Sequence, residues 1–429
     1  MKLHKVLIAS SLLQGFGLLA TMLLGIQLAR YLGPTRYGVY GLIMAVVTIV
    51  VVVAKFGLPL LAMREAAHAN INFKSLLKWF FLRSAGISAG VSIALAVSFY
   101  SFGPKWIRGN IGLVALPAIF VAASAMLSCF VGIVRGVGRN LYGQFVELLL
   151  WPTLVVLGVW FLHTDGELTL NEVFYCQITA LLLCFVLAMM SLVKLAKIQK
   201  STIASFSVTG WAATCATFMV NNLLGALSAS YPMIVAGFFV TGSGLGVLRV
   251  ALASASLLAL PSSIANIATV PIVARELAIK DLDARDRSLS HTTLACFSLT
   301  ASGLIFFAIF GQSLIVILFG RVYSQAYPVL LVLGIGHLII AAFGIAGSYL
   351  SLVGRERLVT KAFLISVPCG LLVSLVSAKY FGIVGAAAGT VVMAAVWHLF
   401  VFGFRGREVD APVSLFKAFA HVWSSPKCP

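Results

Sequence analysis

The fold follows from residues 6–62, which read VLIASSLLQGFGLLATMLLGIQLARYLGPTRYGVYGLIMAVVTIVVVVAKFGLPLLA. This stretch holds two apolar runs, 6–29 and 38–62, and the polar break between them contains Gly33-Pro34. A bilayer needs about 20 apolar residues per helix, because its hydrocarbon core is about 30 Å thick. Each run is long enough to cross a membrane, so the stretch predicts two transmembrane helices joined by a tight turn.

The same pattern continues to the end of the chain and predicts an all-α integral membrane protein of about 12 transmembrane helices. The expected spans are 6–29, 38–62, 80–101, 112–134, 144–163, 173–193, 212–239, 245–273, 292–317, 326–352, 359–378 and 382–404. The run 292–317 is compatible with one helix or with a helix broken at Gly311-Gln312.

The composition excludes other classes of protein. Of 429 residues, 61% are hydrophobic and only 10% are charged, whereas soluble domains are nearer a quarter charged. A soluble enzyme and a disordered chain are therefore both excluded. The net charge of +18 is spread between apolar runs, so it does not indicate nucleic-acid binding. All cysteines except Cys428 lie in apolar runs without CxxC or Cys/His spacing, so no disulfide framework, metal site or cofactor is expected.

The N-terminus resembles a signal peptide, since Lys2 and Lys5 precede an apolar stretch. That stretch is too long for a signal peptide and has no A-x-A ending. We expect a first transmembrane helix that also acts as the targeting signal.

The distribution of Lys and Arg predicts the orientation, because cytoplasmic loops carry an excess of both. With the N-terminus in the cytoplasm, 22 of the 30 basic residues face the cytoplasm and Lys55 lies inside a span. The other seven lie outside or at outer helix ends: Arg30, Arg36, Lys105, Arg108, Arg249, Arg321 and Lys379. Both termini are therefore expected in the cytoplasm. The longest loops, 63–79, 194–211 and 274–291, leave no room for a catalytic domain.

The two halves of the chain resemble each other in the same order, with offsets between 208 and 217 residues. The matches pair Tyr37–Tyr40 with Leu245–Leu248, Pro59 with Pro271, Arg64-Glu65 with Arg275-Glu276, Phe102-Gly103 with Phe319-Gly320 and Gly138-Arg139 with Gly354-Arg355. Six spans per half make a parallel repeat of two six-helix lobes, an architecture suited to alternating access. The expected domains are an N-terminal lobe (1–196), a cytoplasmic linker (197–211), a C-terminal lobe (212–405) and a disordered cytoplasmic tail (406–429).

Three motifs resemble bacterial polysaccharide flippases: Ala29–Gly38, Ile317–Tyr323 and Gly382–Ala387. The similarity covers roughly residues 1–405. The chain resembles the lipid-linked oligosaccharide (O-antigen-type) flippase branch of the multidrug/oligosaccharidyl-lipid/polysaccharide exporter superfamily. The resemblance implies an inner-membrane transporter, not an enzyme. Its cargo would be an undecaprenyl-diphosphate-linked oligosaccharide, such as an O-antigen, capsule or exopolysaccharide repeat unit, moved from the cytoplasmic to the periplasmic leaflet. Membrane lipids, a polysaccharide polymerase and its chain-length machinery would be partners.

A charged headgroup cannot enter hydrocarbon, so such a protein needs a polar, cationic cavity. Lys55 is the leading candidate, because it lies inside a span beside Gly57 and Pro59; snorkelling or pairing with a neighbour is the alternative. Further candidate cavity residues are Arg249, Gln14, Asn222 and Arg30. Their alternatives are an interfacial anchor for Arg249, helix–helix contacts for Gln14 and Asn222, and a structural role for Arg30 beside the Gly-Pro turn.

Two further groups of residues are candidates for gating and coupling. Ion pairs at the cytoplasmic helix ends are a candidate gate, or else ordinary helix-end residues: Arg64, Glu65, Arg275 and Glu276. Glu147, His337 and His398 are candidates for proton coupling, but Glu147 is as compatible with pairing to Arg135 or Arg139, and the histidines with packing. The scarcity of acids inside the spans favours weak coupling, or transport driven by downstream use of the cargo.

Three other functions remain to be weighed. A cation- or drug-extruding antiporter needs buried acids to attract its cargo, whereas this chain has a buried Lys. A glycosyltransferase, polymerase or ligase needs catalytic carboxylates or a large outer loop, and the sequence has neither. A non-transporting membrane subunit of a polysaccharide assembly complex is not excluded by the sequence.

Overall fold

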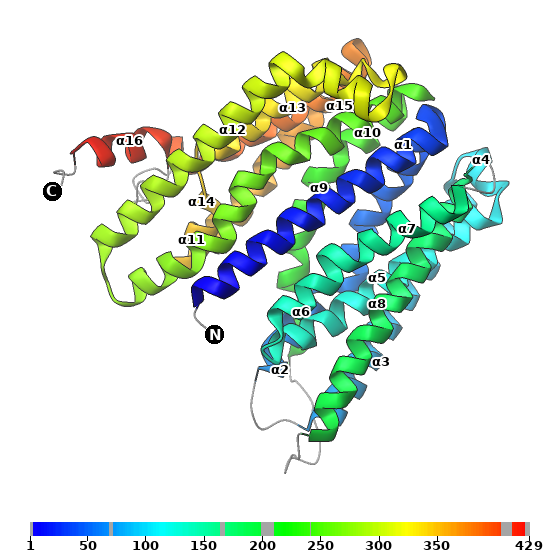
Figure 1. Cartoon of the computed structure of the whole chain (residues 1–429), viewed down its shortest axis with the longest axis horizontal. Coiled ribbons are helices and arrows are strands. Elements are labelled where there is room, and N and C mark those ends of the chain that lie inside the picture. The colour runs from blue at the N-terminus through cyan, green and yellow to red at the C-terminus, as the bar shows by residue number, and fades with distance from the viewer. Residues whose placement is uncertain are drawn as a thin grey trace. The chain divides into compact units, whose positions relative to one another are not determined.

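The computed structural model describes residues 3–67, 72–163, 168–198, 210–240, 242–404 and 414–424, which are almost entirely helical (Figure 1). The first half contains α1 (Leu3–Lys55), α2 (Leu58–Ala66), α3 (Phe73–Phe102), α4 (Lys105–Arg108), α5 (Ile111–Gly136), α6 (Asn140–Gln144), the π-helix η1 (Phe145–Leu150), α7 (Trp151–His163) and α8 (Leu170–Ile198). The second half contains α9 (Trp211–Phe239), α10 (Ser243–Ala255), the 3-10 helix η2 (Ser256–Ala259), α11 (Leu260–Ala278), α12 (Leu282–Phe319), the 3-10 helix η3 (Arg321–Tyr323), α13 (Ala326–Ala341), α14 (Ala346–Leu352), α15 (Glu356–His398), the π-helix η4 (Leu399–Phe404) and α16 (Leu415–Ser424).

Ten helices in the described part of the chain are long and apolar enough to cross a membrane. Two of them, Ile8–Lys55 and Glu356–Phe402, have 48 and 47 residues. At 1.5 Å per residue each is about 70 Å long, twice the thickness of a bilayer core. Each bends at a glycine with positive φ, Gly33 (70°) and Gly382 (56°). Each therefore supplies two spans, which confirms the predicted twelve-helix membrane fold.

The contacts divide the chain into two compact units. The N-terminal unit comprises Leu13–Arg36 and Tyr40–Ser230, and the C-terminal unit comprises Met1–Leu12, Tyr37–Val39 and Tyr231–Pro429. The division falls inside α9. The predicted linker 197–211 lies largely outside the described residues.

Each unit is organised around one central span. In the N-terminal unit, α5 packs against α2, α3 and α8, and it approaches α2 closely because Gly132 has no side chain. A Cβ at Gly132 would lie 2.4 Å from the Pro59 carbonyl oxygen. In the C-terminal unit, α13 packs against α10, α12 and α15. A second apolar cluster there includes Tyr349 and Trp397.

The internal repeat is visible in the backbone. Gly138 (φ 83°) and Gly354 (φ 75°) end equivalent helices in the left-handed conformation. In both cases the next residue donates its N–H to a carbonyl five residues back, Arg139 to Val134 and Arg355 to Leu350. The same glycine-dependent helix cap therefore closes the fourth and the tenth span.

The repeat is not perfect in the second span of each lobe. The break in the N-terminal lobe lies at Phe56–Gly57, just before Pro59. Pro271, the residue predicted to match Pro59, lies inside α11, and that span continues through the 3-10 turn Ser256–Ala259 without a change to left-handed backbone. Only the N-terminal lobe therefore has this break directly after a lysine.

The sequence left two alternatives for 292–317, and helix α12 runs unbroken through Gly311-Gln312. A Cβ on Gly311 would lie 3.3 Å from two carbons of the Tyr327 ring. One sequence expectation, the disordered tail, is corrected. The tail is not without structure, since α16 folds within it and Leu415 N–H donates to the Ala342 carbonyl (2.8 Å).

Candidate substrate cavity

A cavity of about 330 Å³ lies within the N-terminal unit. Its polar lining residues are Lys55, Ser128, Arg135, Glu147 and Asn222, and its remaining lining residues are Val52, Gly57, Pro59, Leu60, Met63 and Gly132. These residues come from α1, α2, α5, η1 and α9. The volume is at the small end of ligand pockets, about 300–1,000 Å³, so the cavity fits a headgroup portion rather than a whole oligosaccharide.

The break in the second span positions Lys55. Lys55 is the last residue of α1, and Phe56 (φ 44°) and Gly57 (φ 71°) then turn the chain. Only glycine fits the second position, because a Cβ on Gly57 would lie 2.4 Å from the Cys215 carbonyl oxygen. Pro59 is the second residue of α2 and has no N–H to donate to the carbonyl of Lys55. The half-buried Lys55 is thereby held at a helix end on the cavity wall.

An aromatic cluster holds the break in place. Phe56 is a non-glycine residue in the left-handed region, a conformation that costs free energy. Its ring packs edge-on against Trp211 at a centroid distance of 6.2 Å, and Trp211 meets Trp79 at 5.5 Å. The Arg83 guanidinium lies over both indoles, 5.3 Å from Trp211 and 5.7 Å from Trp79. These contacts offset the strain at Phe56.

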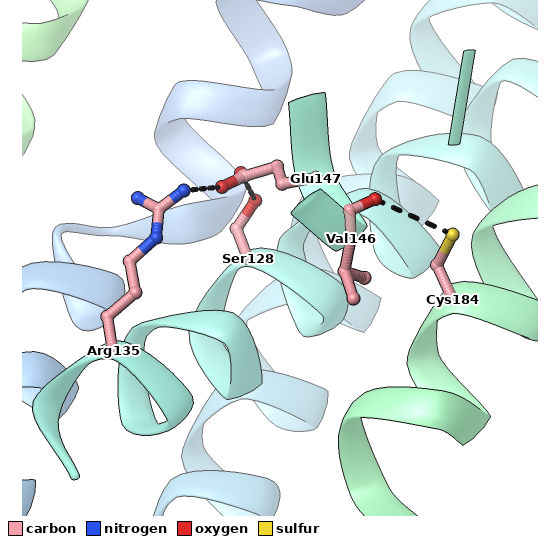
Figure 2. A network of polar contacts seen from close by, with 5 residues as sticks. All are labelled: Ser128, Arg135, Val146, Glu147 and Cys184. Atoms are coloured by element: carbon pink, nitrogen blue, oxygen red, sulfur yellow. Dashed lines mark hydrogen bonds and ion pairs between the residues drawn. The ribbon is translucent and has the colours of Figure 1, made fainter. Parts of the chain in front are cut away.

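Glu147 connects the charged groups of the cavity. Its Oε2 lies 2.7 Å from Arg135 Nη2, and its Oε1 accepts a hydrogen bond from Ser128 Oγ at 3.0 Å (Figure 2). Lys55 interacts electrostatically with both Glu147 and Arg135. The lining therefore contains two cations and one anion, with a net charge of +1.

The backbone around Glu147 is unusual, because Glu147 lies in the π-helix η1. Such turns are rare and often occur at functional sites. The neighbouring Val146 carbonyl accepts a hydrogen bond from the Cys184 thiol (3.7 Å) on α8 (Figure 2). The wider turn is thus supported by a side chain from an adjacent span.

Arg135 lies on the last turn of α5 and packs over Gly143. A Cβ on Gly143 would lie 2.7 Å from Arg135 Cγ, so a larger residue would displace the arginine. The Arg135 Nε is buried and has no hydrogen-bond partner within the described residues. The guanidinium therefore uses only part of its donor capacity in this structure.

The other predicted cavity residues are dispersed. Asn222 is exposed on the cavity lining, and its predicted role toward a substrate stays a prediction. Gln14 is half-buried on α1 but outside that lining, and Arg30 is exposed near the bend of α1. Arg249 lies in the C-terminal unit, where it forms a side-chain hydrogen bond with the buried Tyr37. Whether Arg249 lines a cavity or anchors the helix at the interface stays a prediction.

The predicted gate residues form local contacts. Arg64 pairs with its own neighbour Glu65 at 2.8 Å. Glu276 accepts a hydrogen bond from Ser288 at 2.7 Å, and Arg275 is exposed at the end of α11. A gating role stays a prediction.

The two candidate coupling histidines differ in their surroundings. His337 is half-buried in α13. His398 is 7% exposed, its Nδ1 lies 2.7 Å from the Ala394 carbonyl oxygen, and its ring stacks on Phe343 at 4.2 Å. These contacts are those of a packing histidine, the alternative that the sequence left open.

Arg135 and Ser128 were not predicted as cavity residues. The sequence predicts Arg135 as a basic residue at the cytoplasmic side and as one of two possible partners of Glu147. The structure selects Arg135 for that pair, and Arg139 instead donates to Ser191 Oγ at 2.9 Å. The sequence signal for this pair is the short loop between α5, which carries Arg135, and α6, which continues into η1 with Glu147. A short loop makes the two helical segments antiparallel neighbours.

Comparison with known proteins identifies the family. The family described as polysaccharide biosynthesis protein matches residues 3–276, which is more than half of the chain. The chain belongs to this family. The chain is similar in sequence to the probable low-salt glycan biosynthesis flippase Agl15 of Haloferax volcanii. The two are 24% identical over 374 residues, which cover 86% of this chain and 76% of the relative.

Solved structures of transporters show the fold of this chain. An inward-facing multidrug resistance MATE family transporter of the MOP superfamily aligns over 96% of both chains, with a TM-score of 0.70 and 14% identity. The lipid II flippase MurJ in an inward closed conformation aligns over 98% of this chain and 94% of its own, with a TM-score of 0.67 and 11% identity. The family member described here therefore has the two-lobe, twelve-helix fold of that superfamily.

Proposed function

We propose that this protein is a flippase that moves a polyprenyl-diphosphate-linked oligosaccharide across the membrane by alternating access. Membership of the polysaccharide biosynthesis family and the similarity to a glycan flippase and a lipid II flippase support a transporter of this kind. The observation that carries the proposal is the cavity, which presents Lys55 and Arg135 inside a membrane-spanning unit.

The chemistry of the cargo explains these residues. A diphosphate in hydrocarbon is very unfavourable, so the protein must supply charge and hydrogen bonds where the headgroup crosses. Lys55 and Arg135 supply the positive charge, and an arginine fork suits phosphate oxygens. Asn222 is available to sugar hydroxyls. The polyprenyl chain stays in the lipid, so the cavity holds only the polar portion.

A second candidate is a cation- or drug-extruding antiporter, because MATE transporters share the fold. Glu147 is the feature that favours it, as an acid on a cavity wall. However, Glu147 is already paired with Arg135, and Lys55 leaves the lining with a net positive charge. Such a lining repels cations, so we favour the anionic cargo.

The proposed setting combines the charge distribution with the resemblance to bacterial polysaccharide flippases. The excess of Lys and Arg on one side favours both termini in the cytoplasm. The resemblance is the reason for proposing a bacterial inner membrane and transport toward the periplasmic leaflet. The proposed cargo is an O-antigen, capsule or exopolysaccharide repeat unit. A polymerase and its chain-length machinery are proposed partners that take up the exported unit.

Reconstitution of the purified protein in vesicles tests the proposal. The vesicles contain a fluorescent polyprenyl-diphosphate oligosaccharide, and its transfer between leaflets is followed by an impermeant quencher. We expect protein-dependent transfer of this lipid and no gradient-driven efflux of ethidium. Ethidium efflux without lipid transfer would support the antiporter instead, and neither activity would support a non-transporting subunit.

A further inference from the structure

We propose that Glu147 is an internal counter-ion, which a phosphate group of the cargo displaces from Arg135 when it binds. This inference rests on the proposed function, because it assumes that a diphosphate enters the cavity. It adds a residue of opposite charge to the site and assigns that residue a part in both binding and release.

The contacts of Glu147 suit a displaceable ligand. Its carboxylate reaches Arg135 through one nitrogen, Nη2, and holds Ser128 with its other oxygen. The Arg135 and Glu147 side chains are 27% and 29% exposed, so the pair is open to the cavity rather than sealed in the protein. An entering anion can therefore reach the pair directly.

Arg135 has unused capacity for an anion. A guanidinium binds phosphate best with two parallel N–H donors. In this structure its contact with Glu147 is through Nη2, while the buried Nε lacks a partner in the described part of the chain. A buried donor without a partner is unfavourable. If the guanidinium turns Nε toward the cavity, an anion bound by Nε and a terminal nitrogen would satisfy the donor that Glu147 leaves unpaired.

The charges give a reason for the acid. Lys55 and Arg135 alone would bind a diphosphate tightly, and tight binding slows release. A transport site must bind its cargo well enough to load and weakly enough to unload. Glu147 competes with the phosphate for Arg135, so it weakens binding and re-forms the pair when the cargo leaves.

The π-helix gives Glu147 a way to move. One residue corresponds to a rotation of about 100° in an α-helix. Conversion of the turn Phe145–Leu150 to regular α-helix would therefore turn Glu147 away from Arg135. The hydrogen bond from the Cys184 thiol to the Val146 carbonyl supports the π form. Because a thiol is a weak donor, it presents little resistance to this change.

Binding of farnesyl diphosphate to the purified full-length protein tests the inference. Glu147→Gln keeps the shape and the hydrogen bond to Ser128 but removes the charge. We expect this variant to bind the probe about tenfold more tightly, because a like charge close to the phosphate is removed, and to transport cargo more slowly. Ser128→Ala, which loosens Glu147 without changing charge, should tighten binding by about threefold. Glu356→Gln, an exposed acid of the C-terminal unit, is the matched control and should bind like the wild type.

The outcomes separate the two proposals. If Lys55→Met loses binding but Glu147→Gln and Ser128→Ala bind with wild-type affinity, the counter-ion inference is wrong and the flippase proposal stands. If the wild type and all variants fail to bind farnesyl diphosphate, both are wrong. Equal tightening by Glu356→Gln would show a general charge effect and would also overturn the inference.

Discussion

Replacement of Lys55 by methionine removes the one charge that makes the cavity lining positive. Lys55 lines the cavity beside Arg135 and Glu147, which already neutralise each other. Methionine keeps the apolar stem and removes the ammonium group. A hydrogen bond to a charged group contributes about 1.5–3 kcal/mol. Since about 1.4 kcal/mol corresponds to a factor of ten, the variant should bind a diphosphate about 10- to 150-fold more weakly.

The assay is complementation of a flippase-null strain, scored by the appearance of the lipid-linked unit in the periplasm. Lys55→Met should lose export while its level in the membrane stays normal, because removal of a half-buried charge is not expected to destabilise the fold. Lys55→Arg keeps the charge and should retain most of the export. Lys379→Met is the control, since Lys379 is exposed in the C-terminal unit. Normal export by Lys55→Met at a normal protein level would refute the role of Lys55.

Two further predictions concern the break that holds Lys55. Gly57→Ala should lower the free energy of unfolding by about 2–5 kcal/mol, because the residue has φ 71° and its Cβ would lie 2.4 Å from the Cys215 carbonyl oxygen. The midpoint of thermal unfolding measures this change. Gly225→Ala is the control, because nothing lies within 4 Å of a Cβ at that position. An unchanged midpoint for Gly57→Ala would mean that α1 and α9 do not approach as described. Trp211→Ala should cost about 2 kcal/mol through loss of its ring and cation–π contacts, whereas Trp423→Ala, on an exposed side chain of α16, should be nearly neutral. Equal midpoints for the two tryptophan variants would contradict the aromatic cluster.

The twelve spans could be predicted from the sequence because the requirement is simple. Any segment of about 20 apolar residues satisfies its backbone hydrogen bonds by forming a helix in the membrane. The repeat was predictable for a similar reason, since Gly138 and Gly354 are glycines at positions that need positive φ. Packing was not predictable: the close approach of the Tyr327 ring to Gly311 brings together residues of two different helices.

The site was predictable only in part. A lysine inside a span is conspicuous, because burying its charge is unfavourable and such residues are therefore rare outside functional sites. Arg135 is not conspicuous, because its position at a helix end matches the ordinary excess of basic residues on the cytoplasmic side. Its role depends on Gly143 and on the π-helix at Glu147, which set where the guanidinium lies. Neither feature has a sequence pattern that distinguishes it from a regular helix.

The most direct measurement is a cryo-electron microscopy structure of the full-length protein in lipid nanodiscs with farnesyl diphosphate. We expect density for the diphosphate in the cavity of the N-terminal unit, within hydrogen-bond distance of Lys55 Nζ and the Arg135 guanidinium. We also expect Glu147 to have moved away from Arg135. A Lys55 side chain directed at acyl chains, with the diphosphate bound elsewhere, would contradict the central claim.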